Sequence, residues 1–299
     1  MRKLLTLLLA WCLLGFGNAM AETPLLDDRG VEISASAPQQ VVSLYGSYAD
    51  AWLLAGGALA GVTDDAIQER HLTLPEDVCI VGTTKIPNLE LIVSLEPDLV
   101  LLSMDIAAQM QACDALEALG IACAAFRVDT WQDYDRMMNI FTQLTGRQDL
   151  YDAQLPPMAA QIQSILARAA EKAPPSVLLI RAYSSGAKAK GADNLAGYIL
   201  QDLGCDNIAD RHEALLEELS LEAIVAENPD FIFVTIMGGD EEAALAALDA
   251  SVGQNPAWQA LDAVRQGRLY VLDKELFHYK PNARWGESYE TLYKILYGQ

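Results

Sequence analysis

Positive charge and histidine are scarce in this sequence, and the short motifs of common catalytic sites are missing. The chain has 20 Lys and Arg against 41 Asp and Glu, which gives a formal net charge of −21. A nucleic-acid-binding surface needs clustered cations, so this balance argues against nucleic acid as a partner. GxSxG, GxxxxGKS/T, GxGxxG and HExxH are absent, and the 3 histidines lie far apart. The sequence therefore supports neither an enzyme nor a protein-ligated metal site.

Cysteines are also few, and no two of them form a CxxC pair. Cys12 lies near the amino terminus, and Cys79, Cys113, Cys123 and Cys205 follow at wide spacings. These spacings disfavour a zinc ribbon or a thioredoxin-type site. Cys79 and Cys123 lie in strand-like runs, where buried free thiols are the ordinary interpretation. Cys113 and Cys123 can instead form a disulfide in an oxidising compartment, and the sequence leaves this open.

The longest apolar run lies at the amino terminus and predicts export. Leu4 to Phe16 follows two basic residues and precedes Ala19-Met20-Ala21, a small-residue cleavage pattern. At about 13 residues the run is too short to span a bilayer. We therefore predict a signal peptide over residues 1–21 and a mature protein in the periplasm or at the cell-envelope exterior. Trp11 stands directly before Cys12, where lipoproteins carry a small residue, so lipid anchoring is disfavoured.

Two stretches of the chain are near copies of one another. Asn88 to Val100 reads NLELIVSLEPDLV, and Ser220 to Ile232 reads SLEAIVAENPDFI. In each copy a residue that can cap a helix comes first, a proline that cannot continue the helix follows, and a buried strand begins after it. Glu90 and Glu222 therefore fall at equivalent surface points of two similar units.

Strand-like and helix-like segments alternate along the rest of the chain, which favours mainly parallel sheets covered by helices. The expected strands form a first series before residue 133 and a second series after residue 172. They are residues 41–44, 60–63, 79–81, 99–103 and 121–128, then 177–181, a short run at 207–208, 231–236 and 268–272.

The segment between the two series predicts a helical connector. Residues 134–172 lack strand signals and carry apolar residues at helical spacing. Because proline interrupts helical hydrogen bonding, we expect the connector to break at Pro156-Pro157 and to restart there. The expected organisation is an amino-terminal lobe over 22–133, the connector over 134–172 and a carboxy-terminal lobe over 173–299.

Four blocks resemble, in order, the solute-binding proteins of bacterial ABC importers for iron–siderophore complexes, haem and cobalamin. The blocks read VVSLYGSYADAWLLAGGALAGVTD, VGTTKIPNLELIVSLEPDLVLLS, LSLEAIVAENPDFIFV and NPAWQALDAVRQGRLYVLD. The resemblance implies an α/β fold of two Rossmann-like lobes joined by a long helix, with the ligand cleft between the lobes. It also implies delivery of the ligand to a membrane permease driven by an ATPase on the other side. In that family a surface glutamate on each lobe meets permease arginines, and the matching residues are Glu90 and Glu222.

Ligand contacts are expected from loops at the carboxyl ends of the strands, where open α/β sheets bind ligands. These loops gather cations and aromatic rings in an otherwise acidic chain, which suits an anionic chelate. The expected contacts are Tyr45, Ser47, Tyr48, Lys85, Asp105, Arg181, Tyr183, Lys188, Lys190, Met237, His278 and Arg284.

The sequence thus predicts a monomeric binding protein that captures an anionic, siderophore-type iron chelate and has no intrinsic cofactor. Haem and cobalamin stay open as alternative ligands, and Tyr45, Tyr48, Tyr183 or His278 could ligate haem iron. An exported α/β enzyme on the same lobes is the less favoured alternative.

Overall fold

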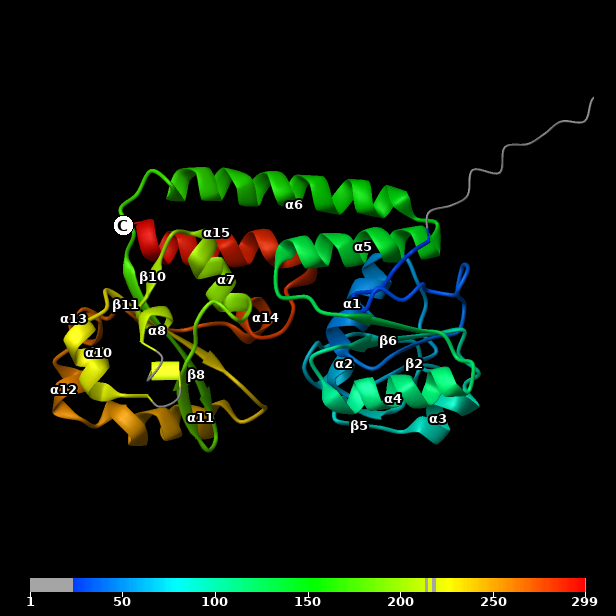
Figure 1. The fold of residues 1–299 in the computed structure, drawn as a ribbon, viewed down its shortest axis with the longest axis horizontal. Coiled ribbons are helices and arrows are strands. Elements are labelled where there is room, and N and C mark those ends of the chain that lie inside the picture. Colours follow the sequence, from blue (N-terminus) through cyan, green and yellow to red (C-terminus); the bar gives the residue numbers. More distant parts are fainter. Residues whose placement is uncertain (1–23, 213–214, 217–218, 299) are drawn as a thin grey trace, which may run out of the picture.

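The computed structural model describes residues 24–212, 215–216 and 219–298. The predicted signal peptide over 1–21 and Cys12 therefore lie outside the described residues. Two lobes stand side by side, and a long helix runs along one side of both (Figure 1).

The amino-terminal lobe is built on a five-stranded parallel sheet of order β3-β2-β1-β6-β7. Its two longest strands, β6 and β7, are fully buried, as expected for a parallel sheet covered on both faces. All five strands lie in the segments that the sequence predicts. They are β1 (Val41–Ser43), β2 (Gly61–Val62), β3 (Cys79–Ile80), β6 (Leu99–Ser103) and β7 (Cys123–Phe126).

The carboxy-terminal lobe has a second parallel sheet of order β10-β8-β11-β12. These four strands were also predicted, so the α/β class with mainly parallel sheets in two lobes is confirmed. They are β8 (Ser176–Tyr183), β10 (Asp206–Asn207), β11 (Phe231–Ile236) and β12 (Leu269–Val271). The sequence analysis missed β9 (Gly186–Ala189), which pairs antiparallel with β8, and the small hairpin of β4 (Gly82–Thr83) and β5 (Ile86–Pro87).

Helices cover both sheets. In the amino-terminal half they are α1 (Gly46–Leu54), α2 (Asp65–Gln68), α3 (Leu89–Ser94), α4 (Ala107–Ala118) and α5 (Trp131–Thr145). In the carboxy-terminal half they are α7 (Leu195–Asp202), α8 (Ile208–Arg211), α10 (Leu221–Glu227), α11 (Glu241–Leu248), α12 (Pro256–Gln259), α13 (Asp262–Arg265), α14 (Lys274–Phe277) and α15 (Trp285–Tyr297). A π-helical turn (Asp249–Gly253) follows α11, and a 3₁₀ turn (Asn282–Arg284) precedes α15.

The duplicated stretches form matching helix–strand units, as predicted. The Asn88 side chain accepts a hydrogen bond from the first turn of α3, and the Ser220 side chain does the same for α10. After each helix the residue before the proline has a left-handed backbone, with φ of 48° at Glu96 and 42° at Asn228. The chain therefore turns in the same way into β6 and β11.

The connector is α6 (Gln148–Ala169), and it runs uninterrupted through Pro156 and Pro157. The predicted break at these prolines is wrong. Both prolines lie on the exposed face of α6, and so do Asp152 and Ala153, whose carbonyl groups lose their helical partners. Water can bond these carbonyls, so the helix continues. The connector region does break, but earlier, at the left-handed Gly146 between α5 and α6.

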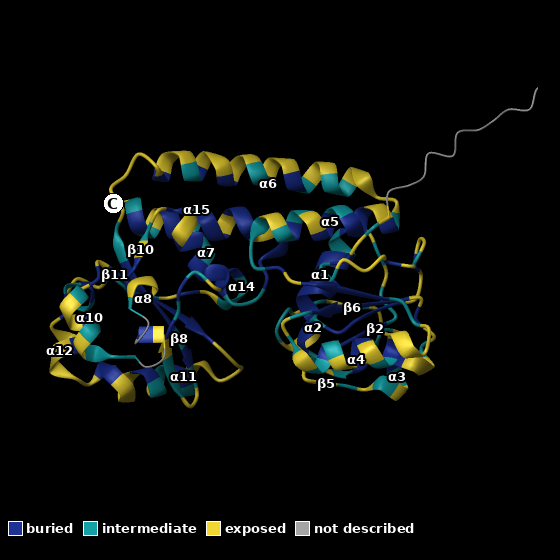
Figure 2. Ribbon diagram, in the orientation of Figure 1, coloured by how far each residue is buried: buried dark blue, intermediate teal, exposed yellow. Residues whose placement is uncertain are grey.

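One hydrophobic cluster joins the two lobes through the helical layer. It contains Tyr48 and Phe126 of the first lobe, Leu155 and Ile162 of α6, and Phe233 of the second lobe. The inner faces of α5, α6 and α15 are buried in it, while the outer face of α6 is exposed (Figure 2). Among the described helices, α6 included, none has the length and apolar character needed to cross a membrane.

The exposed prolines of α6 generate a stability prediction. Pro156→Ala restores a backbone donor in the middle of a helix, so we expect the free energy of unfolding to rise by about 1–3 kcal/mol. Pro174→Ala, in the exposed loop after α6, is the matched control and should give no such gain. Chemical denaturation measures both, and a lower stability of Pro156→Ala would contradict the account.

Candidate functional site

The segment after α14 connects the two lobes directly. The Lys280 ammonium lies 3.1 Å from the Asp129 carboxylate, and Arg70 donates a 3.1 Å hydrogen bond to the Lys280 carbonyl. The buried Asn282 side chain donates to the Ser47 carbonyl at 2.8 Å and to the Asp50 carboxylate at 2.7 Å. Residues 280–282 thus fix the second lobe against the ends of β1 and β7.

Two cavities on this boundary are lined by residues of both lobes. The first, of about 580 Å³, lies between α2 and the segment around α14. The second, of about 590 Å³, lies between the end of β7 and α7. The first is lined by Glu69, His71, Glu241, Val271, Leu272, Asp273, Lys274, Glu275 and Tyr279. The second is lined by Leu26, Asp27, Asp28, Gly30, Met104, Arg127, Asp129, Asp133, Arg136 and Tyr198.

Arg181 is a half-buried cation with no ion-pair partner among the described residues. Its Nε atom is buried and makes no hydrogen bond, and no described carboxylate lies within 4.0 Å of the guanidinium. Burial lowers the pKa of Arg181, partly offset by the charges of Asp193 and Asp129. A partly desolvated charge without a counter-ion is costly, and a bound anion would reduce that cost.

The pKa of His278 is affected by the positive charge of Arg181 and of two lysines. Burial, and then the charges of Arg181, Lys274 and Lys280, lower the pKa of His278 to about 4. The imidazole is therefore neutral at physiological pH and can donate or accept a hydrogen bond. The charges of three cations thus act on His278, one of them, Lys280, being paired with Asp129.

Aromatic rings lie next to these cations. The His278 and Tyr279 rings are 5.3 Å apart, and Tyr45 lies edge-on to Tyr48 with ring centroids 5.1 Å apart. Burial, then the nearby Glu69 and Tyr45, raise the pKa of Tyr279 to about 12. The influence of Tyr45 on Tyr279 thus runs from the first lobe to the second.

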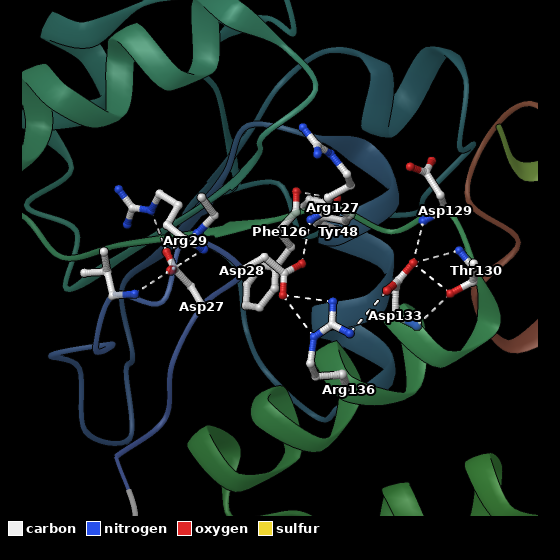
Figure 3. Close-up of polar contacts among 12 residues, drawn as sticks. Asp27, Asp28, Arg29, Tyr48, Phe126, Arg127, Asp129, Thr130, Asp133 and Arg136 are labelled. Atoms are coloured by element: carbon white, nitrogen blue, oxygen red, sulfur yellow. Dashed lines mark hydrogen bonds and ion pairs between the residues drawn. The ribbon is translucent and has the colours of Figure 1, made fainter. Parts of the chain in front are cut away.

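The wall of the second cavity is an ion-pair network (Figure 3). Asp28 accepts from Arg136 at 2.9 Å and from the Arg127 backbone amide at 2.8 Å. Asp133 accepts from Arg136 at 3.2 Å and completes a capping box with Thr130 at the start of α5. These bonds hold the end of β7 in position beside the cleft.

The structure does not bring all the predicted contacts into the cleft. Tyr48 is fully buried and donates its hydroxyl to the Phe126 carbonyl at 3.0 Å, so it supports the lobe from within. Ser47 is also buried, behind Tyr45. Arg284 is on the surface, bonded to Glu275 and, at 2.7 Å, to Glu287.

The remaining predicted contacts lie at strand ends and turns. Arg181 and Lys188 are cross-strand partners in the β8–β9 hairpin, so their side chains project from the same face as Tyr183. The others are Lys85, exposed in the β4–β5 turn; Asp105, 2.6 Å from Arg127; Lys190, 2.7 Å from Asp193; and Met237, 44% exposed after β11.

Sequence reasoning missed Arg127 and Lys274. Arg127 directly follows β7, and Lys274 lies just beyond β12, where its ammonium donates to the Gly238 carbonyl at 2.7 Å. The rule that ligands bind at the carboxyl ends of strands would have found both residues if it had been applied to every strand.

The chain belongs to the periplasmic binding protein family, whose model matches residues 41–276. This confirms the family predicted from the sequence and identifies the protein as a substrate-binding protein that works outside the cytoplasm. The chain is 25% identical over 255 residues to the Fe(3+)-citrate-binding protein YfmC of Bacillus subtilis, covering 83% of this chain and 78% of that protein. It is 26% identical over 279 residues to the Fe(3+) dicitrate-binding periplasmic protein FecB of Escherichia coli, covering 89% and 87% respectively.

Solved structures share the fold. S. aureus IsdE complexed with heme superposes with a TM-score of 0.72 at 19% identity, covering 86% of this chain and 98% of that chain. Staphylococcus aureus SirA complexed with staphyloferrin B gives a TM-score of 0.68 at 22% identity, covering 92% and 98%. At these identities the likeness establishes the two-lobed architecture alone.

The lowered pKa of His278 generates a pH prediction. Between about pH 6.5 and pH 4 the unfolded chain takes up a proton that folded His278 does not, so stability falls as the pH falls through this window. His278→Gln should remove about 1–3 kcal/mol of that loss by pH 4. Denaturant titrations from pH 7 to pH 4 measure the difference. The wild-type protein is the reference, and equal slopes for the wild type and His278→Gln would contradict the prediction.

Proposed function

We propose that this protein captures an anionic ferric chelate of the citrate or carboxylate-siderophore type and delivers it to an ABC importer. The observation that carries the proposal is the half-buried Arg181, which has no ion-pair partner among the described residues and whose charge, with that of Lys274, acts on His278. Guanidinium groups bind carboxylates in a bidentate manner, and a partly desolvated site strengthens that bond. The two ferric-citrate-binding relatives support the same ligand class.

In this proposal, the ligand lies between the lobes. Arg181, Lys188 and Lys274 supply positive charge, and Tyr45 and Tyr279 cover the apolar parts of the chelate. Tyr48, Ser47 and Arg284 are left out because the structure places the first two in the interior and pairs the third with two carboxylates. The protein acts as a monomeric carrier without intrinsic cofactor or catalysis.

Haem is the second candidate ligand, because the His278 and Tyr279 rings are neighbours beside the segment that joins the lobes. Tyrosine and histidine both serve as axial ligands of haem iron. An absorbance spectrum of protein incubated with haem separates the two candidates, since axial ligation gives a sharp Soret band and ferric citrate gives none.

Arg181→Met tests the proposal. We expect the affinity for ferric citrate to fall by roughly 10- to 100-fold, the scale of a lost charge-assisted hydrogen bond. The thermal stability of the ligand-free protein should stay equal or rise, since a half-buried unpaired charge is removed. Calorimetric titration measures the first and thermal denaturation the second.

Arg265→Met is the matched control, because Arg265 is exposed on α13, away from the lobe boundary. It should bind ferric citrate as the wild type does. Unchanged affinity in Arg181→Met would contradict the anionic-chelate proposal and favour a neutral ligand held by the aromatic rings.

Glu90 and Glu222 are proposed to dock the two lobes onto the permease. Both side chains are exposed in the first turns of α3 and α10. Figure 1 shows these two helices away from α6, one in each lobe. If the permease binds the carrier at both lobes, the cleft between the lobes is positioned over the transport path. The shared helix–strand units place these acids equivalently, which a random surface pair would not show.

The double variant Glu90→Ala/Glu222→Ala should therefore keep the wild-type affinity for ferric citrate and lose most of its uptake activity. Uptake of radiolabelled iron by cells or vesicles that contain the importer measures the loss. Glu171→Ala, an exposed acid just beyond α6, is the control and should transport normally. Normal uptake by the double variant would remove the docking role.

A further inference from the structure

Two cysteine thiols lie together at the outer edge of the amino-terminal lobe, far from the proposed ligand site in sequence. Cys113 is in α4, and Cys123 begins β7. Their sulfur atoms and a carboxylate oxygen of Glu117 all lie within 4.8 Å of one another. Both cysteines are at least 95% buried, whereas Glu117 is exposed. The two sulfurs are therefore close neighbours without a bond between them.

Arg29 covers the pair and connects it to the amino-terminal segment. Its guanidinium donates to the Cys113 sulfur at 3.0 Å, to Glu117 at 2.9 Å and to the Cys123 carbonyl at 3.2 Å. Asp27 fixes the same guanidinium through a 2.7 Å ion pair, which Figure 3 shows. Arg29 thus links the two cysteines and Glu117 to Asp27 of the amino-terminal segment.

The surroundings shift the pKa values of the two thiols in opposite directions. The hydrogen bond with Cys123 is the largest influence on Cys113 and lowers its pKa; burial opposes this, and the Arg29 charge adds to the lowering. The same hydrogen bond, with burial, raises the pKa of Cys123. Cys113 is thus the nucleophile of the pair, and Cys123 is the thiol that would resolve a mixed disulfide.

We propose that Cys113 and Cys123 form a disulfide that Arg29 promotes and that ties α4 to β7 once the protein has reached an oxidising compartment. Because Cys113 is buried, the exchange begins when local opening admits a donor disulfide. The Cys113 thiolate attacks one sulfur of that disulfide, whose other half leaves as a thiolate. Cys123 then loses its proton and attacks the Cys113 sulfur, and the second donor sulfur leaves. The two cysteine thiols are oxidised by two electrons, and the donor disulfide is reduced to two thiols that take up the two protons.

A metal ion on the same three ligands is disfavoured by Arg29. Two thiolates and a carboxylate would suit a thiophilic cation. The guanidinium already occupies the space beside Cys113 and Glu117, however, and its positive charge would repel such an ion. The geometry instead suits Arg29 to stabilise the Cys113 thiolate, which prepares it for disulfide exchange.

The first test identifies which cysteines of the protein are free and which are disulfide-bonded. The protein is exported to the periplasm of a bacterial host, purified without reductant, unfolded and alkylated. We expect Cys113 and Cys123 to be unmodified and joined in one pair of peptides, while Cys79 and Cys205 carry the alkyl group. Reduction should lower the melting temperature by roughly 5 °C or more, and in Cys113→Ser reduction should cause no shift. Alkylation of all four cysteines would overturn the proposal, and so would stoichiometric binding of added zinc by the pair.

The second test concerns Arg29. Arg29→Met should slow oxidation of the reduced protein by oxidised glutathione about 3- to 10-fold at pH 7 and move the midpoint of its pH–rate profile to higher pH. The greater nucleophilicity of the less acidic thiol limits the loss. Arg136→Met is the matched control, because Arg136 binds Asp28 of the same amino-terminal segment but does not contact the thiols. An equal slowing in both variants would show that Arg29 acts only by holding the segment, and would overturn its proposed role.

Discussion

The two lobes depend on one hydrophobic core that continues from the first sheet through α5, α6 and α15 into the second sheet. Leu155, Ile162 and Ile165 of α6 are buried in it, together with residues of both sheets. Opening the lobes as independent bodies would expose this apolar surface at roughly 25 cal/mol per Å². The helical layer therefore keeps the lobe boundary nearly fixed, and the polar bridge through Lys280 and Asn282 adds a second connection. A cleft held in this way is shaped before the ligand arrives, so little ordering free energy is lost on binding.

The fixed boundary explains how an acidic protein can hold cationic side chains together. With a net charge of −21, the average field of the surface attracts cations and repels anions. Arg70, Arg127 and Lys280 are neutralised by Asp50, Asp105 and Asp129. Arg181 differs because none of the described carboxylates pairs with it, and its charge adds to burial in lowering the pKa of His278. The lobe boundary thus carries a local positive charge in an acidic protein, and an anionic ligand can bind there.

Much of the fold could be predicted from the sequence, because its signals are local. Runs such as Leu99–Ser103 and Phe231–Ile236 identify buried parallel strands, and Asn88 and Ser220 mark the helix starts. The continuity of α6 could not be predicted, since it depends on which face the prolines occupy. The β8–β9 hairpin was also missed, because Gly186–Ala189 has little strand propensity and gains its pairing from β8.

The sequence predicted which loops contribute to the candidate site, but not how their side chains are arranged. Arg181 and His278 were named from the sequence and lie together, while Tyr48 followed the same strand-end rule and turned inward. Tyr48 is buried because it packs against a segment distant in sequence, the end of β7. No local sequence pattern indicates such a contact. The lobe limits at residues 133 and 173 stay a prediction.

The most direct test of the account compares two iron chelates of opposite electrostatic character on the wild-type protein. Isothermal titration with ferric citrate, which is anionic, and with a neutral ferric trihydroxamate is carried out at the same iron concentration, at low and high salt. The account predicts saturable binding of ferric citrate, weaker at high salt, and at least about a tenfold preference over the neutral chelate. Equal affinity for the two chelates, or binding of the neutral one alone, would contradict it.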